Sequence, residues 1–110
     1  MHELAIVEDV IDTVTERLPD KKITSIRLEI GELSGVVADA LLFSFGLATE
    51  GTNLEGATLE ISSIPGRCQC RSCGSEFSPE RPPFLLCPCG SADAVVLAGN
   101  ELKIASVKVA

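Results

Sequence analysis

The sequence predicts an α+β protein in which two helices pack on a small three-stranded mixed sheet, with an inserted zinc-ribbon-like four-cysteine domain. Three observations lead to this fold class. Helical and strand periodicities alternate along the first part of the chain. All five cysteines fall between Cys68 and Cys89. Strand-like alternation then resumes at residues 102–109, so the cysteine segment interrupts an α/β unit.

Residues 4–18 have the pattern of an amphipathic helix that ends at Pro19. Apolar side chains recur at intervals of three and four residues, as Leu4, Val7, Ile11, Val14 and Leu18. Acidic residues fill the opposite face. We expect the apolar stripe to be buried and the acidic face to be solvated, with docking of a partner as the alternative.

A strand, a second helix and a second strand follow the first helix. Residues 24–30 alternate with period two, and residues 57–61 do the same. Between them, residues 38–50 carry one apolar stripe made of Leu41, Leu42, Phe45 and Ala48. Two strands joined through a helix favour a parallel pairing, because the helix spans the length of the sheet before the chain re-enters it.

The cysteine segment has the layout of a tetrahedral zinc site. A C-x-x-C pair and a C-x-C pair are each followed by glycine, which can take the positive φ that closes a turn. Four thiolates from two such turns enclose one Zn²⁺ and leave no open position, which is typical of a structural site. We expect the zinc ligands to be Cys70, Cys73, Cys87 and Cys89.

The second cysteine pair is one residue shorter than the usual zinc knuckle. Chelation by Cys87 and Cys89 across a single residue is sterically possible but tight. Cys68 is a fifth thiol close enough to substitute for a ligand. A pair of disulfides is the alternative to zinc. We expect zinc, because no signal peptide precedes the chain and a reducing compartment is favoured.

The predicted order of elements assigns residues 1–65 and 99–110 to an α/β domain and residues 66–98 to a zinc-binding domain. The zinc-binding segment contains few hydrophobic side chains, so we expect metal to supply its stability. With 110 residues and 45% hydrophobic content, the chain can build one modest core and a small satellite.

Charge and hydropathy exclude two classes of partner. The net charge of −7 argues against nucleic acid, because phosphate binding needs a basic surface. No apolar run approaches the roughly 18 residues needed to span a bilayer. We therefore expect a cytoplasmic protein without nucleic-acid or membrane partners, present as a monomer or a weak homodimer.

The N-terminus offers a second set of metal donors. The α-amine of Met1, the amide nitrogen of His2 and the His2 imidazole can close two fused chelate rings around one ion. The backbone nitrogen of Glu3 would complete a planar set of four nitrogens, which suits Ni²⁺ or Cu²⁺. A histidine at a chain end usually has no role, so the residues alone leave both interpretations open.

Several motifs, in one order along essentially the whole chain, carry a resemblance to a known family. They are Met1-His2-Glu3-Leu4, Leu28-Glu29-Ile30-Gly31-Glu32-Leu33-Ser34, Glu50-Gly51-Thr52 and the two cysteine pairs. In these features the chain resembles the HypA/HybF hydrogenase-maturation nickel chaperones. The resemblance implies a nickel-binding α/β domain and a structural zinc domain. It also implies a partner GTPase and delivery of nickel to the large subunit of nickel–iron (NiFe) hydrogenase.

Carried over by position, the resemblance makes His2 the nickel ligand, with the Met1 amine and Glu3 completing its motif. We predict a metallochaperone, not an enzyme, that takes Ni(II) at its N-terminus and passes it on by ligand exchange. A site at a chain end is open enough for a partner's ligands to replace its nickel donors one bond at a time. The Zn(II) site would be structural.

Two other functional classes compete with this prediction. The first is a zinc-ribbon protein–protein adaptor that has no nickel function. The second is a thiol oxidoreductase that uses Cys68 with Cys70, or Cys87 with Cys89. The oxidoreductase is disfavoured because no histidine or lysine lies near these cysteines in sequence to lower a thiol pKa.

Overall fold

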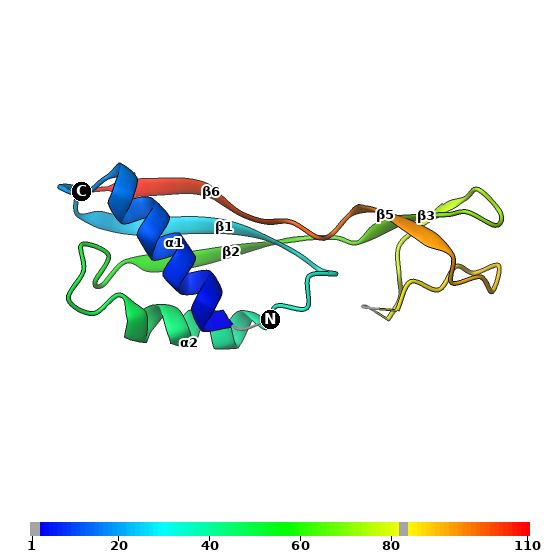
Figure 1. The fold of residues 1–110 in the computed structure, drawn as a ribbon, viewed down its shortest axis with the longest axis horizontal. Helices are drawn as coiled ribbons and strands as arrows, with labels where there is room; N and C mark the ends of the chain where they lie inside the picture. The colour runs from blue at the N-terminus through cyan, green and yellow to red at the C-terminus, as the bar shows by residue number, and fades with distance from the viewer. Residues whose placement is uncertain (1–2, 82–83) are drawn as a thin grey trace. The chain divides into compact units, whose positions relative to one another are not determined.

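The computed structural model describes residues 3–81 and 84–110. Its elements in chain order are α1 (Glu3–Arg17), β1 (Ile23–Gly31), α2 (Ala38–Ala48), β2 (Thr58–Ile64), β3 (Arg67–Cys70), β4 (Glu76–Phe77), β5 (Ala94–Ala98) and β6 (Leu102–Val109) (Figure 1). Among the helices of the described residues, none is long and apolar enough to cross a membrane.

The chain forms two compact units. The first comprises Met1–Leu28, Val36–Ser62 and Ile104–Ala110, and the second comprises Glu29–Gly35 and Ser63–Lys103. The unit that contains the cysteines thus also takes in residues 29–35. The assignment of residues 1–65 and 99–110 to nickel binding, and of residues 66–98 to zinc binding, stays a prediction.

The first sheet has the strand order β2-β1-β6. Figure 1 draws β1 and β2 in the same direction and β6 in the opposite one. The N–H of Ala110 donates to the Lys22 carbonyl at 2.9 Å, and the N–H of Gly31 donates to the Glu101 carbonyl at 2.7 Å. As the residue number increases along β1, the residue number of its hydrogen-bond partner on β6 therefore decreases, which is the arrangement of an antiparallel pair. The predicted fold class, two helices with a small mixed sheet, is confirmed.

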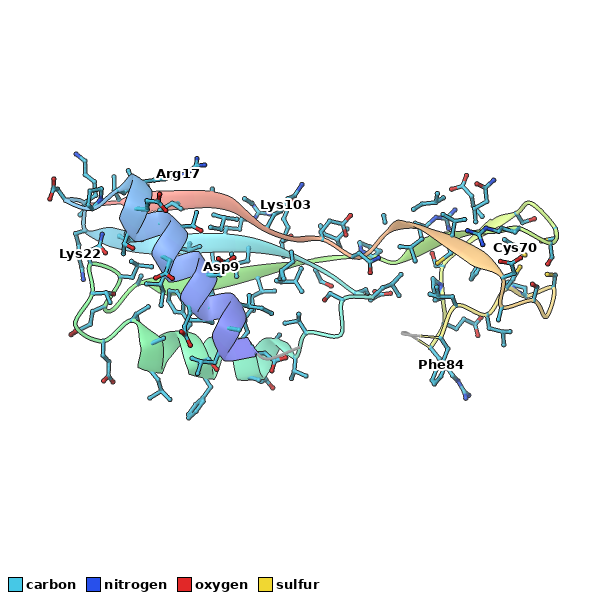
Figure 2. The ribbon with its side chains drawn as sticks, in the orientation of Figure 1. Asp9, Arg17, Lys22, Cys70, Phe84 and Lys103 are labelled. Carbon is cyan, nitrogen blue, oxygen red and sulfur yellow. The ribbon has the colours of Figure 1, made fainter. Side chains whose placement is uncertain are left out.

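Helix α1 buries one face in the core of the first unit. Its buried residues are Ile6, Val7, Val10, Ile11 and Val14. Most of the predicted stripe is therefore correct, but Leu4 is 49% exposed, contrary to the prediction. The buried face is rotated towards Ile6 and Val10, which leaves Leu4 at its edge. Four acidic residues of α1 are exposed, namely Glu8, Asp9, Asp12 and Glu16, and Asp9 is labelled in Figure 2.

Helix α2 buries a narrower stripe, consisting of Leu41 and Phe45. Leu42, which the sequence placed on the same apolar stripe, is instead 44% exposed. Residues four apart lie on one face of a helix, whereas the residue next to Leu41 points about 100° away from it. Phe43 and Leu47 are exposed as well, so α2 presents apolar side chains to solvent.

The second unit contains a sheet that the sequence analysis did not predict, with the strand order β4-β3-β5. Both pairings of β3 are antiparallel, and Cys68 lies opposite Phe77 on β4 and Val96 on β5. The buried cluster of this unit is small and unusual in composition. It consists of Cys68, Cys70, Phe77 and Cys87.

One glycine of the second unit permits a close approach of two chain segments. The N–H of Leu33 donates to the carbonyl of Gly99 at 2.7 Å, just beyond the end of β1. A Cβ added to Gly31 would lie only 1.9 Å from that Gly99 oxygen. Only a residue without a side chain fits at Gly31, because the Gly99 backbone occupies the space.

Candidate metal centre

The first cysteine turn forms the tip of the hairpin between β3 and β4. The N–H of Cys70 donates to the carbonyl of Ser75 at 2.9 Å, and the N–H of Gly74 donates to the carbonyl of Cys70 at 2.9 Å. Gly74 has a φ of +78°, in the left-handed region that favours glycine. The predicted role of this glycine in closing the turn is confirmed.

The second cysteine turn closes in the same way, although its cysteines are separated by one residue. The N–H of Cys87 donates to the carbonyl of Ser91 at 2.9 Å, and the N–H of Gly90 donates to the carbonyl of Cys87 at 2.8 Å. Gly90 has a φ of +96°. The shortened C-x-C turn is therefore closed by hydrogen bonds between Cys87 and two residues that follow the cysteine pair, Gly90 and Ser91.

The two turns bring four thiols together, from Cys70, Cys73, Cys87 and Cys89, and Cys70 is labelled in Figure 2. All four sulfur atoms lie within 4.8 Å of one another. The Cys70 and Cys89 sulfurs lie 3.7 Å apart, as do the Cys73 and Cys87 sulfurs. A tetrahedral ion with Zn–S bonds of about 2.3 Å separates its sulfurs by roughly 3.8 Å. The cluster therefore fits a structural zinc site.

The fifth thiol lies outside this group. Cys68 is fully buried on β3 and packs in the small cluster with Phe77. Burial raises the pKa of the Cys68 thiol and outweighs the opposite effect of the Arg67 guanidinium. A neutral buried thiol behaves as a small hydrophobic side chain, so this position serves the core of the unit.

The four gathered thiols differ in how readily they ionise. The backbone N–H of Cys73 donates to the Cys70 sulfur at 3.4 Å, and this hydrogen bond is the main reason that the pKa of Cys70 is lowered to about 6. The backbone N–H of Cys89 lowers the pKa of Cys87, but burial and the neighbouring thiols outweigh it and raise that pKa to about 12.

These opposite shifts follow from the different surroundings of the thiols. A first negative charge enters the cluster easily, since a backbone N–H is aimed at the Cys70 sulfur. Further thiolates would be crowded against it, and like charges disfavour one another at short range. A divalent cation at the centre removes this repulsion and allows all four thiols to ionise. The donor set therefore suits a metal ion better than it suits four neutral thiols.

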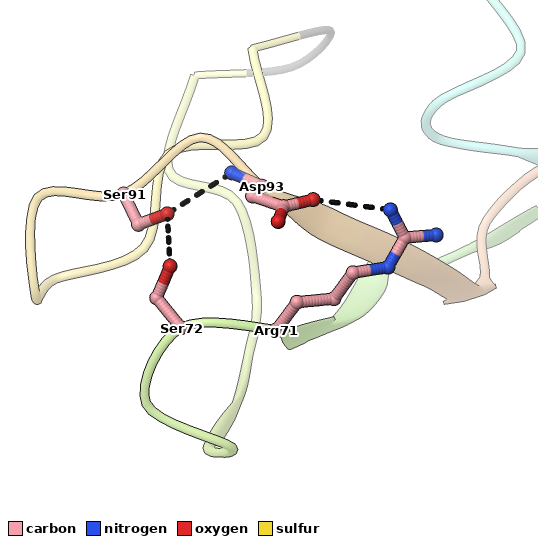
Figure 3. Close-up of polar contacts among 4 residues, drawn as sticks. All are labelled: Arg71, Ser72, Ser91 and Asp93. Atoms are coloured by element: carbon pink, nitrogen blue, oxygen red, sulfur yellow. Dashed lines mark hydrogen bonds and ion pairs between the residues drawn. The ribbon is translucent and has the colours of Figure 1, made fainter.

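Four polar residues around the cysteines were missed by the sequence analysis. The hydroxyl groups of Ser72 and Ser91 form a hydrogen bond with each other, and Arg71 and Asp93 form an ion pair (Figure 3). No spacing signal marks them, because none of the four belongs to a repeated pattern in the sequence. Their contacts connect segments that lie about twenty residues apart in the chain.

The predicted nickel residues Met1 and His2 lie outside the described residues. Glu3 begins α1, and its carboxylate accepts a hydrogen bond from the backbone N–H of Val37 at 3.2 Å. Val37 is the N-cap residue of α2 and makes no side-chain cap of its own. The side chain of Glu3 thus contacts the start of α2, whereas its predicted nickel donor is the backbone nitrogen.

Comparison with known proteins gives matches over nearly the whole chain. A family model described as "Hydrogenase/urease nickel incorporation, metallochaperone, hypA" matches residues 1–109. The hydrogenase maturation factor HypA of Nostoc sp. is 46% identical over 109 residues, covering 99% of this chain and 96% of that protein. The HypA of Geobacter metallireducens is 43% identical over 110 residues, covering 99% of each.

Solved structures share the fold. The solution structure of the Ni metallochaperone HypA from Helicobacter pylori matches with a TM-score of 0.68 at 24% identity, covering 99% of this chain and 97% of that one. A second solution structure, of a HypA protein, matches with a TM-score of 0.70 at 24% identity, covering 100% and 97%. At this level of identity the likeness establishes the architecture.

Proposed function

Because this chain belongs to the HypA family of nickel-incorporation metallochaperones, we propose that it binds Ni²⁺ at its N-terminus and delivers it for the maturation of NiFe hydrogenase. The observation that carries the proposal is the family match over residues 1–109, which includes the segment Met1-His2-Glu3. In this proposal the chain catalyses no reaction, and nickel is its cargo.

The nickel donors in this proposal are nitrogens of three consecutive residues. They are the α-amine of Met1, the amide and imidazole nitrogens of His2, and the backbone nitrogen of Glu3. Such nitrogens favour planar coordination, which suits Ni²⁺ and excludes Mg²⁺ and Ca²⁺. Glu3 lies in the first turn of α1.

Zinc is the resident metal in this proposal, and its ligands are Cys70, Cys73, Cys87 and Cys89. The sulfur separations of 3.7 Å between the two turns support this assignment. The site has four protein donors, so it offers no open position for a substrate. We assign it a structural role in a zinc domain of residues 66–98, beside a nickel domain of residues 1–65 and 99–110.

The proposal also includes partners and a compartment. A hydrogenase-maturation GTPase and the hydrogenase large subunit would exchange nickel with this chain in the cytoplasm. The exposed apolar side chains of α2, among them Phe43 and Leu47, support contact with another protein. The chain itself would be a monomer or a weak homodimer.

Calorimetric titration of nickel tests the central proposal. The titrations use the zinc-loaded protein without a tag, the same protein with an acetylated N-terminus, and the His2→Ala variant. We expect binding only in the first, because both the amine and the imidazole are donors. Circular dichroism checks that all three are folded. Equal affinity in all three would eliminate the N-terminal site and leave the zinc-ribbon adaptor as the better interpretation.

A further inference from the structure

We propose that Arg71, Ser72, Ser91 and Asp93 form a clasp that holds the two cysteine turns together and sets how slowly the centre releases zinc. These four residues are positioning residues, since their side chains are not predicted ligands. The proposal rests on the zinc site proposed above. It concerns the retention of zinc and is independent of nickel binding.

The two serines join the turns directly. Ser72 lies inside the first turn, between Cys70 and Cys73, and its Oγ lies 2.8 Å from the Oγ of Ser91. The backbone carbonyl of Ser91 accepts the N–H of Cys87 at 2.9 Å. Ser91 therefore closes the second turn through its backbone and contacts the first turn through its side chain.

Arg71 and Asp93 make a second connection through two hydrogen bonds. The backbone N–H of Arg71 donates to the carbonyl of Asp93 at 2.8 Å, and the Arg71 guanidinium donates to the Asp93 carboxylate at 3.0 Å. The N–H of Asp93 in turn donates to Ser91 Oγ at 3.1 Å, which links the ion pair to the serine pair (Figure 3). The four residues thus form one continuous network.

The geometry of the centre explains why such a clasp matters. Each turn supplies only two of the four sulfurs, so the site is complete only when both turns stand at the correct separation. Zinc leaves one sulfur at a time, and a sulfur that stays near the ion can bind it again. A clasp that keeps the turns adjacent therefore favours recapture over release. Residues beyond the direct ligands commonly tune metal affinity in this way.

The clasp contributes little to global stability, which separates its role from a merely structural one. Arg71 and Asp93 are 62% and 59% exposed in their side chains, and exposed ion pairs are weak in water. Salt screens such a pair further. Removing the ion pair between Arg71 and Asp93 should therefore change the rate of zinc release and the dependence of that rate on salt. The melting temperature of the zinc-loaded protein should stay nearly constant.

Transfer of zinc from the loaded full chain to a chromogenic chelator tests the proposal. The clasp variants are Ser72→Ala, Ser91→Ala and Asp93→Asn. Matched controls come from the same unit: Arg67 forms an exposed ion pair with Glu76 and donates to the hydroxyl of Ser78. Glu76→Gln and Ser78→Ala remove a similar carboxylate and a similar hydroxyl without touching the clasp.

We expect each clasp variant to release zinc about 10-fold faster than wild type, at the low end of the effect of residues around a metal site. The controls should match wild type. Raising the salt concentration should accelerate release from wild type but not from Asp93→Asn. Ser72→Thr keeps the hydroxyl and should restore slow release, and the Ser72→Ala, Ser91→Ala double variant should resemble either single variant.

Equal release rates in clasp and control variants would overturn the clasp. A salt response that persists in Asp93→Asn would overturn the part assigned to the ion pair. A wild-type protein that carries no zinc would instead contradict the zinc site itself, so the two proposals fail in different ways. If Ser72→Ala does not fold, Asp93→Asn still decides the outcome, because it leaves both serine hydroxyls in place.

Discussion

The Glu3 carboxylate accepts a hydrogen bond from the backbone N–H of Val37 at 3.2 Å and so connects the first turn of α1 to the N-cap of α2. An anion at the start of a helix is favoured by the exposed N–H groups and by the helix dipole. The residue that follows His2 in the chain is therefore anchored by its side chain. Its backbone nitrogen is the nickel donor in our proposal.

Removing this carboxylate should weaken the connection between the two helices. We expect Glu3→Ala to lower the free energy of unfolding by about 1 kcal/mol, the usual net value of one hydrogen bond. Glu3→Gln keeps an acceptor oxygen and should lose less. Urea unfolding measures both. Both variants keep the backbone nitrogen and should still bind nickel, with affinities in the same order as their stabilities. Identical stability and affinity in Glu3→Ala, Glu3→Gln and wild type would contradict an anchoring role.

The fifth cysteine should be dispensable for zinc. Cys68 packs against Phe77 outside the four-thiol group, so Cys68→Ser should retain close to one zinc per chain, whereas Cys73→Ser should lose most of it. Metal content of purified protein gives the answer. Cys68→Ala separates the cost of burying a hydroxyl from any loss of a ligand. Equal zinc loss in the Cys68 and Cys73 variants would make Cys68 a ligand.

Removing zinc should loosen the cysteine-containing unit selectively. Its buried cluster contains three cysteines and Phe77, whereas the first unit buries aliphatic side chains from α1, β1 and α2. We expect amide hydrogen exchange to accelerate throughout residues 66–98 after chelation and to stay slow in α1 and β1. Full protection of residues 66–98 in the zinc-free protein would count against a stabilising role of the metal.

Zinc binding should release protons in a number that depends on pH. At about pH 7.5 the Cys70 thiol, with a pKa of about 6, is already ionised, whereas Cys87, with a pKa of about 12, must lose its proton. Fewer than four protons should therefore be released per zinc. At about pH 5.5 Cys70 is protonated too, so the number should rise and the affinity fall. Calorimetry in buffers of different ionisation enthalpy counts these protons, and a constant count would refute the ionisation of Cys70.

Two glycine substitutions should have opposite effects on stability. In Gly31→Ala the new Cβ meets the Gly99 carbonyl oxygen at 1.9 Å, so the backbone must shift, and we expect a loss of roughly 3 kcal/mol or more. In Gly46→Ala the new Cβ on α2 meets nothing within 4 Å, and the better helix propensity should add about 0.5–1 kcal/mol. Denaturant unfolding measures both changes. A neutral Gly31→Ala would show that the segments can separate without cost.

Much of the secondary structure follows from the sequence alone, because the relevant interactions are local. The period of the apolar residues identified α1, β1, α2 and β2. The spacing of the cysteines and the glycines behind them predicted two tight turns, and Gly74 and Gly90 take the positive φ that such turns require. Each of these features depends on a few consecutive residues, so no knowledge of distant contacts was needed.

Tertiary structure alone decided which contacts surround the thiols. Spacing favoured Cys70 as a ligand and left Cys68 as a possible substitute, and both cysteines are buried on β3. Pairing with β4 and β5 places Cys68 opposite Phe77, in the apolar cluster. The exposure of Leu42 and the contact of Ser72 with Ser91 likewise depend on segments that are distant in sequence, and packing between distant segments has no signature in local periodicity.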